Sequence, residues 1–381
     1  MRLCFVIMPI GSDDAYRVYL NRYENLIKPA IEGVERNGAR VYKSLRADFI
    51  SSTGSINRTV LQHIYDADVV LADVTDLNPN VFYELGVRHS LRNGTILLAL
   101  KGTKLPFDVG DLNVVFYEDK LGGEKAVIPR IRELLDGLID SKTEDSPVFF
   151  VLPDLQNAFA GDLGESKARN SALEKETTEL RVKLAVAEQV NLSLRDSVAT
   201  FERTMNAVIE RFAPEERALS DKAVQDALHQ QEQSARRTLP VISGIEQDPK
   251  AMFVLMPFHK GFEGVYGLIR EVGESLGLRV FRADEMTSPG LITDQIFEAI
   301  FRAGIILADI TGKNPNVLYE IGLAHSLMKE TILISQVGET IPFDIASMRV
   351  IMYENTVSGS ESLKTTLYES LKSIIEKKRS G

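Results

Sequence analysis

The sequence contains no tryptophan and a single cysteine, and it has no apolar run near the roughly 18 to 20 residues that a membrane-spanning helix needs. The lone Cys4 excludes a disulfide within one chain, so we expect a buried thiol and a reducing, cytoplasmic environment. The apolar N-terminal stretch is broken by Pro9 and returns internally as MFVLMPF, which indicates a strand rather than a signal peptide. We therefore expect no membrane partner.

The sequence also has no excess of basic residues. Its formal net charge is −10, and no Lys/Arg cluster offsets this locally. That charge opposes a phosphate backbone, so nucleic acid is not an expected partner. The sequence has neither GxGxxG after its first apolar run nor GxxxxGK[ST] anywhere, which argues against dehydrogenases and P-loop ATPases. No His/Cys/Asp set has zinc spacing, and we expect neither a metal nor a cofactor.

An internal repeat organises the 381 residues. The segment ADVVLADVTDLNPNVFYELGVRHSL at 67–91 returns as AGIILADITGKNPNVLYEIGLAHSL at 303–327, an offset of 236 residues. The tripeptide PFD at 106–108 returns at 342–344 with the same offset. The chain therefore contains two copies of one domain, which we place at 1–143 and 247–381.

Within each copy, short apolar runs rich in valine and isoleucine alternate with amphipathic stretches. This pattern predicts an α/β fold, a three-layer Rossmann-like or flavodoxin-like domain with a parallel sheet covered on both faces. The opening strands align at an offset of 248, so the first copy has 12 extra residues around Gly11–Tyr23, where we expect a loop or a helix. Ligands bind such sheets at the carboxyl ends of the strands.

The segment between the copies, 144–246, has a different residue pattern, which predicts a helical connector. Apolar residues spaced alternately by three and four follow one another from Leu173 to Phe212, which predicts a coiled coil at about 166–213. Asn191 falls on this seam and favours a parallel homodimer or a higher homo-oligomer. The alternative is one long helix packed against its own globular domains.

The repeated segment carries the acidic residues that could perform chemistry. A strand-end Asp73 is followed by an Asn-Pro-Asn loop and by a helix with Glu84, and Asp309 and Glu320 are their counterparts. With Asn80 and its counterpart Asn316 as N-caps, each glutamate falls near the first turn, where the helix dipole favours an ionised carboxylate. A carboxylate there can attack or stabilise a cationic sugar centre.

Ordinary capping and turn chemistry is the alternative interpretation of the same residues. Near-letter retention in both copies, while presumed surface positions such as Arg88 and Ala324 differ, favours a functional constraint. His89 and His325 recur too, but we expect them to be partly buried histidines with hydrogen-bond partners.

At these residues the chain resembles nucleoside 2-deoxyribosyltransferase-like proteins and, more distantly, TIR-type NAD-cleaving domains. The resemblance covers both copies but not the connector. It implies that Glu84 and Glu320 are the nucleophiles and that Asp73 and Asp309 are the strand-end aspartates. The sequence departs from the family in its Asn-Pro-Asn loop. It also has Met-Pro after the first strand of each copy, where the family has a tyrosine.

Two functions follow from these observations. The first is cleavage or transfer at the N-glycosidic bond of a nucleoside, nucleotide or NAD-like molecule, and two domains joined by a coiled coil suit a role in signalling or defence. The second is a non-catalytic nucleotide sensor that reorganises an oligomer through the coiled coil. Arg46 with Asp48, and Arg282 with Asp284, either contact a ribose or phosphate or pair with each other. The full set of expected substrate-binding residues is Asp73, Asn78, Asn80, Tyr83, Asp309, Asn314, Asn316, Tyr319, Met8, Pro9, Met256, Pro257, Arg46, Asp48, Arg282 and Asp284.

Overall fold

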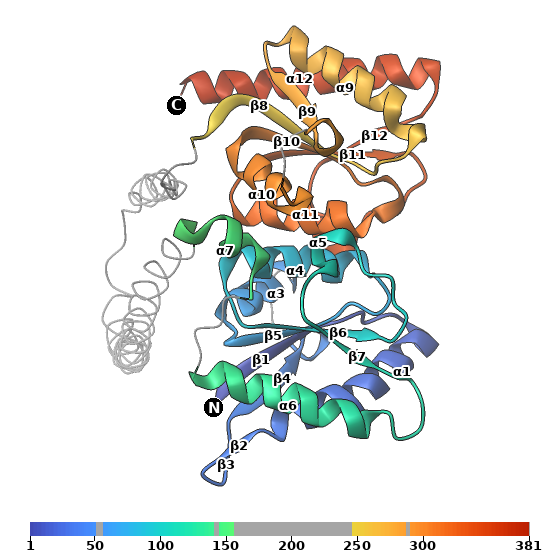
Figure 1. Ribbon diagram of the computed structural model, residues 1–381. Coiled ribbons are helices and arrows are strands. Elements are labelled where there is room, and N and C mark those ends of the chain that lie inside the picture. The colour runs from blue at the N-terminus through green and yellow to red at the C-terminus, as the bar shows by residue number, and fades with distance from the viewer. Residues whose placement is uncertain (51–55, 141–144, 156–245, 287–289, 381) are drawn as a thin grey trace, which may run out of the picture. The chain divides into compact units, whose positions relative to one another are not determined.

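The structure, a computed structural model, describes residues 1–50, 56–140, 145–155, 246–286 and 290–380 (Figure 1). The described residues before and after the segment 156–245 belong to one compact unit. The predicted coiled coil and its Asn191 lie outside the described residues, so the parallel dimer stays a prediction. In the described parts of the chain, no helix is long and apolar enough to cross a membrane.

The first copy of the repeat folds into a five-stranded parallel sheet with the spatial order β4-β1-β5-β6-β7. Its strands are β1 (Arg2–Ile7), β4 (Tyr42–Arg46), β5 (Val69–Asp73), β6 (Thr95–Leu100) and β7 (Val114–Tyr117). All residues of β5 are buried, as expected for a central strand covered on both faces. An antiparallel hairpin, β2 (Glu35–Arg36) with β3 (Ala39–Arg40), forms a separate two-stranded sheet.

The second copy repeats this parallel sheet in the order β12-β11-β10-β8-β9. Its strands are β8 (Asp248–Leu255), β9 (Arg279–Arg282), β10 (Ala303–Asp309), β11 (Glu330–Gln336) and β12 (Val350–Tyr353). Counted within each copy, both sheets have the strand order 2-1-3-4-5, so the prediction of two α/β domains with parallel sheets is confirmed. In this order the winding reverses between the first and third strands, and ligands bind flavodoxin-like sheets at that point.

Helices cover both faces of each sheet (Figure 1). In the first copy, one face carries α2 (Lys28–Glu32) and α6 (Glu124–Asp140), and the other carries α3 (Ile56–Asp66) and α4 (Pro79–Leu91). In the second copy, one face carries α9 (Glu263–Ser275) and α12 (Val357–Ser380), and the other carries α10 (Ile292–Arg302) and α11 (Pro315–Ser326). A short helix, α7 (Pro147–Val151), lies inside the segment predicted as connector but packs against α4 and α10.

The extra residues of the first copy form a helix, which was one of the two expected outcomes. Helix α1 (Asp13–Arg22) runs into a π-helical turn at Tyr23–Ile27 and then into α2. This extension places Arg22 beside the carboxyl end of β5, where its Nη1 lies 2.6 Å from a carboxylate oxygen of Asp73.

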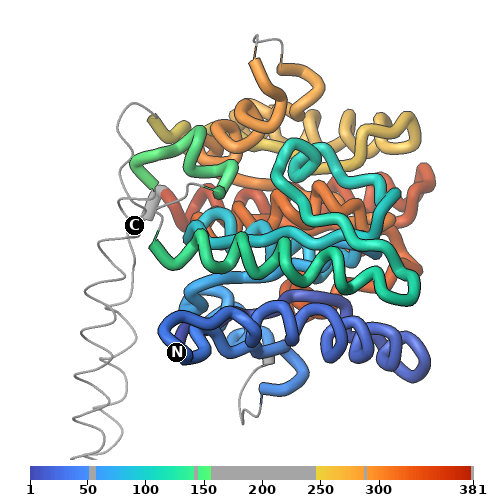
Figure 2. Tube along the Cα trace, turned by 60° about the horizontal axis from the view of Figure 1, so that its bottom comes forward, coloured from blue at the N-terminus to red at the C-terminus, as the bar shows by residue number. Residues whose placement is uncertain are grey.

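The two copies contact each other through α4 and α11, which lie side by side (Figure 1 and Figure 2). The repeated glycines allow this approach. A Cβ atom on Gly86 would lie 2.1 Å from the carbonyl oxygen of Tyr319, and one on Gly322 would lie 2.3 Å from that of Tyr83. Any side chain at either position would force the helices apart. Part of the retention in the repeated motif therefore comes from this interface.

The tyrosines and histidines of the motif also meet at this interface. The Tyr83 hydroxyl lies 3.2 Å from Nδ1 of His325, and the Tyr319 hydroxyl lies 2.8 Å from Nδ1 of His89. Burial lowers the pKa of His89 to about 3 and that of His325 to about 4, so both rings are neutral at neutral pH. The expectation of buried, hydrogen-bonded histidines is confirmed. Tyr83 and Tyr319 were expected to bind substrate, but in the structure their hydroxyl groups lie at this interface instead.

Arg88 is fully buried, so its assignment to the surface is wrong. Its guanidinium donates to the carbonyl oxygens of Ile64 and Ala67 at 2.8 and 2.9 Å, near the carboxyl end of α3. The second copy has alanine at the equivalent position, and there Lys329 donates to the carbonyl oxygens of Phe301 and Ala303. A cation satisfies the last carbonyls of the helix in both copies, but it comes from a different position in the sequence.

Candidate functional site

A cavity of about 420 Å³ lies in the first copy at the reversal point of its sheet. Met8 and Pro9 follow β1 and form one wall, while Asn78, Asn80 and Glu84 come from the start of α4. Ile10, Ile50, Val60 and Val81 add apolar surface, and Asp48 adds a carboxylate. Volumes of about 300 to 1,000 Å³ are typical of small-molecule sites, so this cavity can hold a nucleoside-sized ligand.

The start of α4 differs from the prediction by two residues. The side chain of Asn78, not Asn80, caps the helix by accepting from the backbone N–H groups of Asn80 and Val81 at 3.0 and 3.4 Å. In the second copy Asn314, not Asn316, accepts from the N–H of Asn316 at 2.9 Å. The intervening proline occupies the first helical position, where its fixed φ suits a helix and its missing N–H costs nothing. This places the glutamates in the second turn.

Glu84 and Glu320 are therefore not held as carboxylates by the helix dipole, whose effect fades after the first turn. Both side chains are buried, with exposed fractions of 7% and 6%. Burial raises the pKa of Glu84 well above its usual range, and the nearby Asp344 raises it further. Burial and Asp108 raise the pKa of Glu320 in the same way. The expectation of ionised glutamates is corrected, because each shares a dry environment with a second carboxyl group.

That second carboxyl group comes from the other copy of the domain. Phe343 and Asp344 of the second copy line the cavity of the first. Two asparagines of the first copy hold this segment in place. Asn57 Nδ2 donates to the carbonyl oxygens of Phe343 and Asp344, both at 3.1 Å, and Asn80 Oδ1 accepts from the N–H of Asp344 at 3.4 Å. The repeated PFD tripeptide was the signal for these residues, but its pattern alone predicts no role.

The two aspartates of the tripeptides have few partners of their own. Among the residues that the structure describes, Oδ2 of Asp344 and both carboxyl oxygens of Asp108 are buried without a hydrogen-bond partner. Burial raises the pKa of Asp344 to about 7 and that of Asp108 to about 8. Buried polar groups in folded proteins are nearly always satisfied, so unsatisfied carboxyl groups that occur in both copies call for an explanation.

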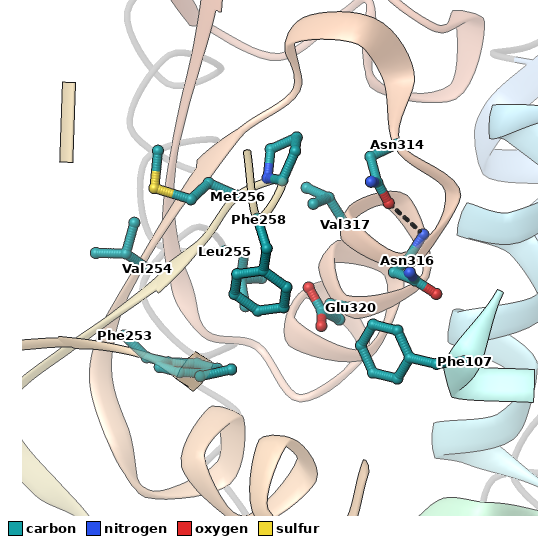
Figure 3. Close-up of a pocket in the computed structure, with 12 residues that line it drawn as sticks. Phe107, Phe253, Val254, Leu255, Met256, Phe258, Asn314, Asn316, Val317 and Glu320 are labelled. Carbon is teal, nitrogen blue, oxygen red and sulfur yellow. Dashed lines mark hydrogen bonds between the residues drawn. The ribbon is translucent and has the colours of Figure 1, made fainter. Parts of the chain in front are cut away.

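The pocket around Glu320 in the second copy is nearly closed. Its volume is about 20 Å³, which is room for little more than one water molecule. It is lined by equivalents of the first cavity, namely Met256, Pro257, Asn314, Asn316 and Glu320. Phe258 stands where the first copy has Ile10, and Figure 3 shows its ring with that of Phe107 around the Glu320 carboxylate. The two copies thus keep the same polar residues around very different volumes.

The strand-end aspartates do not line either cavity. Asp73 accepts hydrogen bonds from Arg22 at 2.6 Å and from the N–H of Thr75 at 3.1 Å. Asp309 accepts from the Tyr353 hydroxyl at 2.7 Å and from the N–H of Thr311 at 3.0 Å. Both carboxylates close the turn that follows their strand, so the structure does not bring them together with the glutamates.

The arginine–aspartate motifs pair internally, which was one of the two interpretations. Arg46 is fully buried and its Nε donates to Asp48 at 2.5 Å. Arg282 donates to Asp284 at 2.6 Å and to Glu263 at 3.0 Å. Of these four residues only Asp48 lines a cavity, so it alone is placed to contact a ligand there.

No protein-family model matches the sequence, and no curated protein matches it. Among solved structures, the rubredoxin oxygen:oxidoreductase from the anaerobe Desulfovibrio gigas matches over 34% of this chain, with 16% identity and a TM-score of 0.26. The match spans 38% of that protein's length.

Proposed function

We propose that the chain cleaves the N-glycosidic bond of a nucleoside, nucleotide or NAD-like molecule in the cavity of the first copy. Glu84 is the group that attacks or stabilises the sugar carbon C1′. The observation that carries the proposal is a buried glutamate in a 420 Å³ cavity at the reversal point of a parallel sheet. Resemblance to nucleoside 2-deoxyribosyltransferase-like proteins, in which the matching glutamate is the nucleophile, supports the same role.

The electrostatics of the cavity favour a ligand that carries or develops positive charge. Without a ligand, burial and Asp344 raise the pKa of Glu84 and so favour its neutral carboxyl form. A cation nearby reverses this preference, because an opposite charge in a dry site stabilises the carboxylate strongly. A sugar oxocarbenium ion is such a cation, and so is the pyridinium ring of an NAD-like molecule. Glu84 therefore becomes an effective carboxylate when the glycosidic bond is ready to break.

The walls of the cavity suit the two halves of such a substrate. Met8, Ile50, Val81 and Phe343 offer apolar surface for a flat base. Asn78 and Asn80 lie at the start of α4, and the Oδ1 atom of each already accepts a hydrogen bond from a backbone N–H. Their amide N–H groups can then donate to sugar hydroxyls.

Base release from the full chain tests this proposal. The protein is incubated with nucleosides, nucleotides and NAD⁺, and free base is separated by chromatography. We expect base release from at least one of these compounds and its loss in Glu84→Gln. Exposed Glu354, replaced by glutamine, provides a control for the change of charge alone. No free base from any compound would contradict the proposal.

A second candidate is a nucleotide sensor, and one observation favours it. Residues of both copies line the cavity, so a bound ligand contacts both copies at once. Binding there would stabilise their arrangement by mass action even without chemistry. Saturable binding of NAD⁺ or a nucleotide, measured by calorimetry without any release of base, would favour this candidate over the enzyme.

A further inference from the structure

Glu84 and Asp344 line the same cavity although they belong to different copies of the domain. Asn57 and Asn80 hold the backbone around Asp344, but neither donates to its carboxyl group. In the described residues its Oδ2 atom is buried without a partner. The fold thus holds the backbone that carries this carboxyl group, while its Oδ2 atom has no hydrogen-bond partner among the described residues.

Burying a carboxyl group without a donor costs stability, so folding alone gives no reason to keep it. Asp108 of the first copy is the counterpart beside Glu320 of the second copy, and it is 3% exposed and has no partner for either oxygen among the described residues. Beside the second cavity there is almost no room for a ligand. In the cavity of the first copy, Asp344 lines a volume that is large enough for a substrate.

We propose that Asp344 of the second copy is the proton donor and acceptor for chemistry at Glu84 of the first copy. One active site is then assembled from both copies of the repeat. The inference rests on the proposed function for its reaction, while the placement of the two carboxyl groups comes from the cavity itself.

Two carboxyl groups in one dry site do not both ionise, so the pair keeps one proton between them at neutral pH. A positive charge beside Glu84 draws the ionised form to that residue and leaves the proton on Asp344. The pKa of Asp344, raised to about 7 by burial, is suited to a group that both gives and takes a proton near neutrality.

The reaction then proceeds in two steps. In the first, a Glu84 carboxylate oxygen bonds to C1′ and the C1′–N bond breaks. The electron pair leaves with the base, whose nitrogen takes the proton of Asp344. In the second step a water oxygen bonds to C1′, Asp344 accepts a proton from that water, and the C1′–Glu84 bond breaks. The products are the free base and the sugar, and both carboxyl groups return to their starting states.

The proton on Asp344 matters for some leaving groups and not for others. A purine or pyrimidine leaves as an anion unless its nitrogen is protonated. A pyridinium base, such as the nicotinamide of NAD⁺, leaves as a neutral molecule and needs no proton. Asp344 therefore serves the first step for the one class and only the second step for the other.

Asp344→Asn in the full chain separates these cases, with adenosine and NAD⁺ as probes. With adenosine we expect the variant to release adenine about 100-fold more slowly, from the first turnover onward. With NAD⁺ we expect a rapid burst of about one nicotinamide per chain, followed by slow turnover as the glycosyl–Glu84 intermediate persists. Whichever probe the wild type accepts provides the test.

Asp111→Asn is the control, because Asp111 is an exposed aspartate outside the cavity. It should leave both rates unchanged, and circular dichroism should show that both variants keep the fold. Full activity in Asp344→Asn, or equal slowing of both steps with NAD⁺, would overturn the acid–base role. A wild type that releases no base contradicts the proposed function instead, which keeps the two failures apart.

Discussion

The side-chain oxygen of Asn80 accepts a hydrogen bond from the backbone N–H of Asp344 at 3.4 Å. This contact joins the start of α4 in the first copy to the segment after β11 in the second. It places an aspartate of one copy at the wall of the other copy's cavity, beside Glu84. The tandem repeat therefore does more than duplicate a domain, because each copy completes the acidic environment of its neighbour.

The helix interface that makes this possible depends on Gly86. Replacing Gly86 with alanine puts a Cβ atom where only 2.1 Å separates it from the carbonyl oxygen of Tyr319. We expect a loss of about 1 to 3 kcal/mol in the free energy of unfolding, because α4 and α11 must move apart. Urea unfolding followed by circular dichroism measures it. Gly137→Ala is the matched control in helix α6, where the added Cβ meets nothing within 4 Å, and it should be neutral or slightly stabilising.

The stability of the protein should fall as the pH rises toward about 8, because of Asp108. Burial raises its pKa from the ordinary value of 3.8 to about 8, beside the buried Glu320 and Tyr319. A carboxyl group with a raised pKa in the folded state contributes its full stability below the unfolded pKa. That contribution is lost as the pH rises through the folded value.

Asp108→Asn removes this loss. Relative to the wild type, the variant should gain more than about 1 kcal/mol of stability at pH 9 compared with pH 5, since one pKa unit corresponds to about 1.4 kcal/mol. Urea unfolding at the two values gives the difference. Asp119→Asn, at an exposed position, is the control. An equal effect of Asp108→Asn at both pH values would show that Asp108 is not buried as an acid.

The volumes of the two cavities predict one ligand per chain. Phe258 stands in the second pocket where Ile10 stands in the first, and that pocket measures about 20 Å³ against about 420 Å³. Calorimetry with NAD⁺ should give a stoichiometry near one for the wild type and a larger value for Phe258→Ile. Phe116→Ile changes an exposed phenylalanine outside either pocket and should leave the stoichiometry unchanged. Two sites of equal affinity in the wild type would contradict the closed second pocket.

The sequence predicted the features that depend on local pattern. The apolar runs predicted the parallel strands, and the repeat predicted two domains of one fold with an insertion in the first, either a loop or a helix, which the structure shows as a helix. The cap was misplaced by two residues because Pro79 was not recognised as the first helical position. Asp73 was assigned to the site because strand ends carry ligands, but Arg22 from the inserted helix occupies its carboxylate.

Contacts between the two copies could not be predicted from the sequence pattern. Tyr83 and His325 are 242 residues apart in the chain, and no pattern in either segment predicts their contact. The same holds for Asp344 in the cavity of Glu84. Charged side chains are usually exposed, so the sequence predicts Arg88 at the surface, yet its guanidinium donates to carbonyl groups in the interior. A residue that is retained in both copies can therefore contribute to the interface between them and not to ligand binding.

Base release by Glu84→Gln compared with Glu320→Gln tests the proposed chemistry most directly. Glutamine keeps the size of the side chain but cannot become a carboxylate, so ligand binding should survive while the transition state loses its stabilising charge. We expect Glu84→Gln to lower the rate about 100-fold or more at nearly unchanged affinity. Glu320→Gln, in the nearly closed pocket, should keep most of the activity. Full base release by Glu84→Gln in a folded protein would contradict Glu84 as the reacting group.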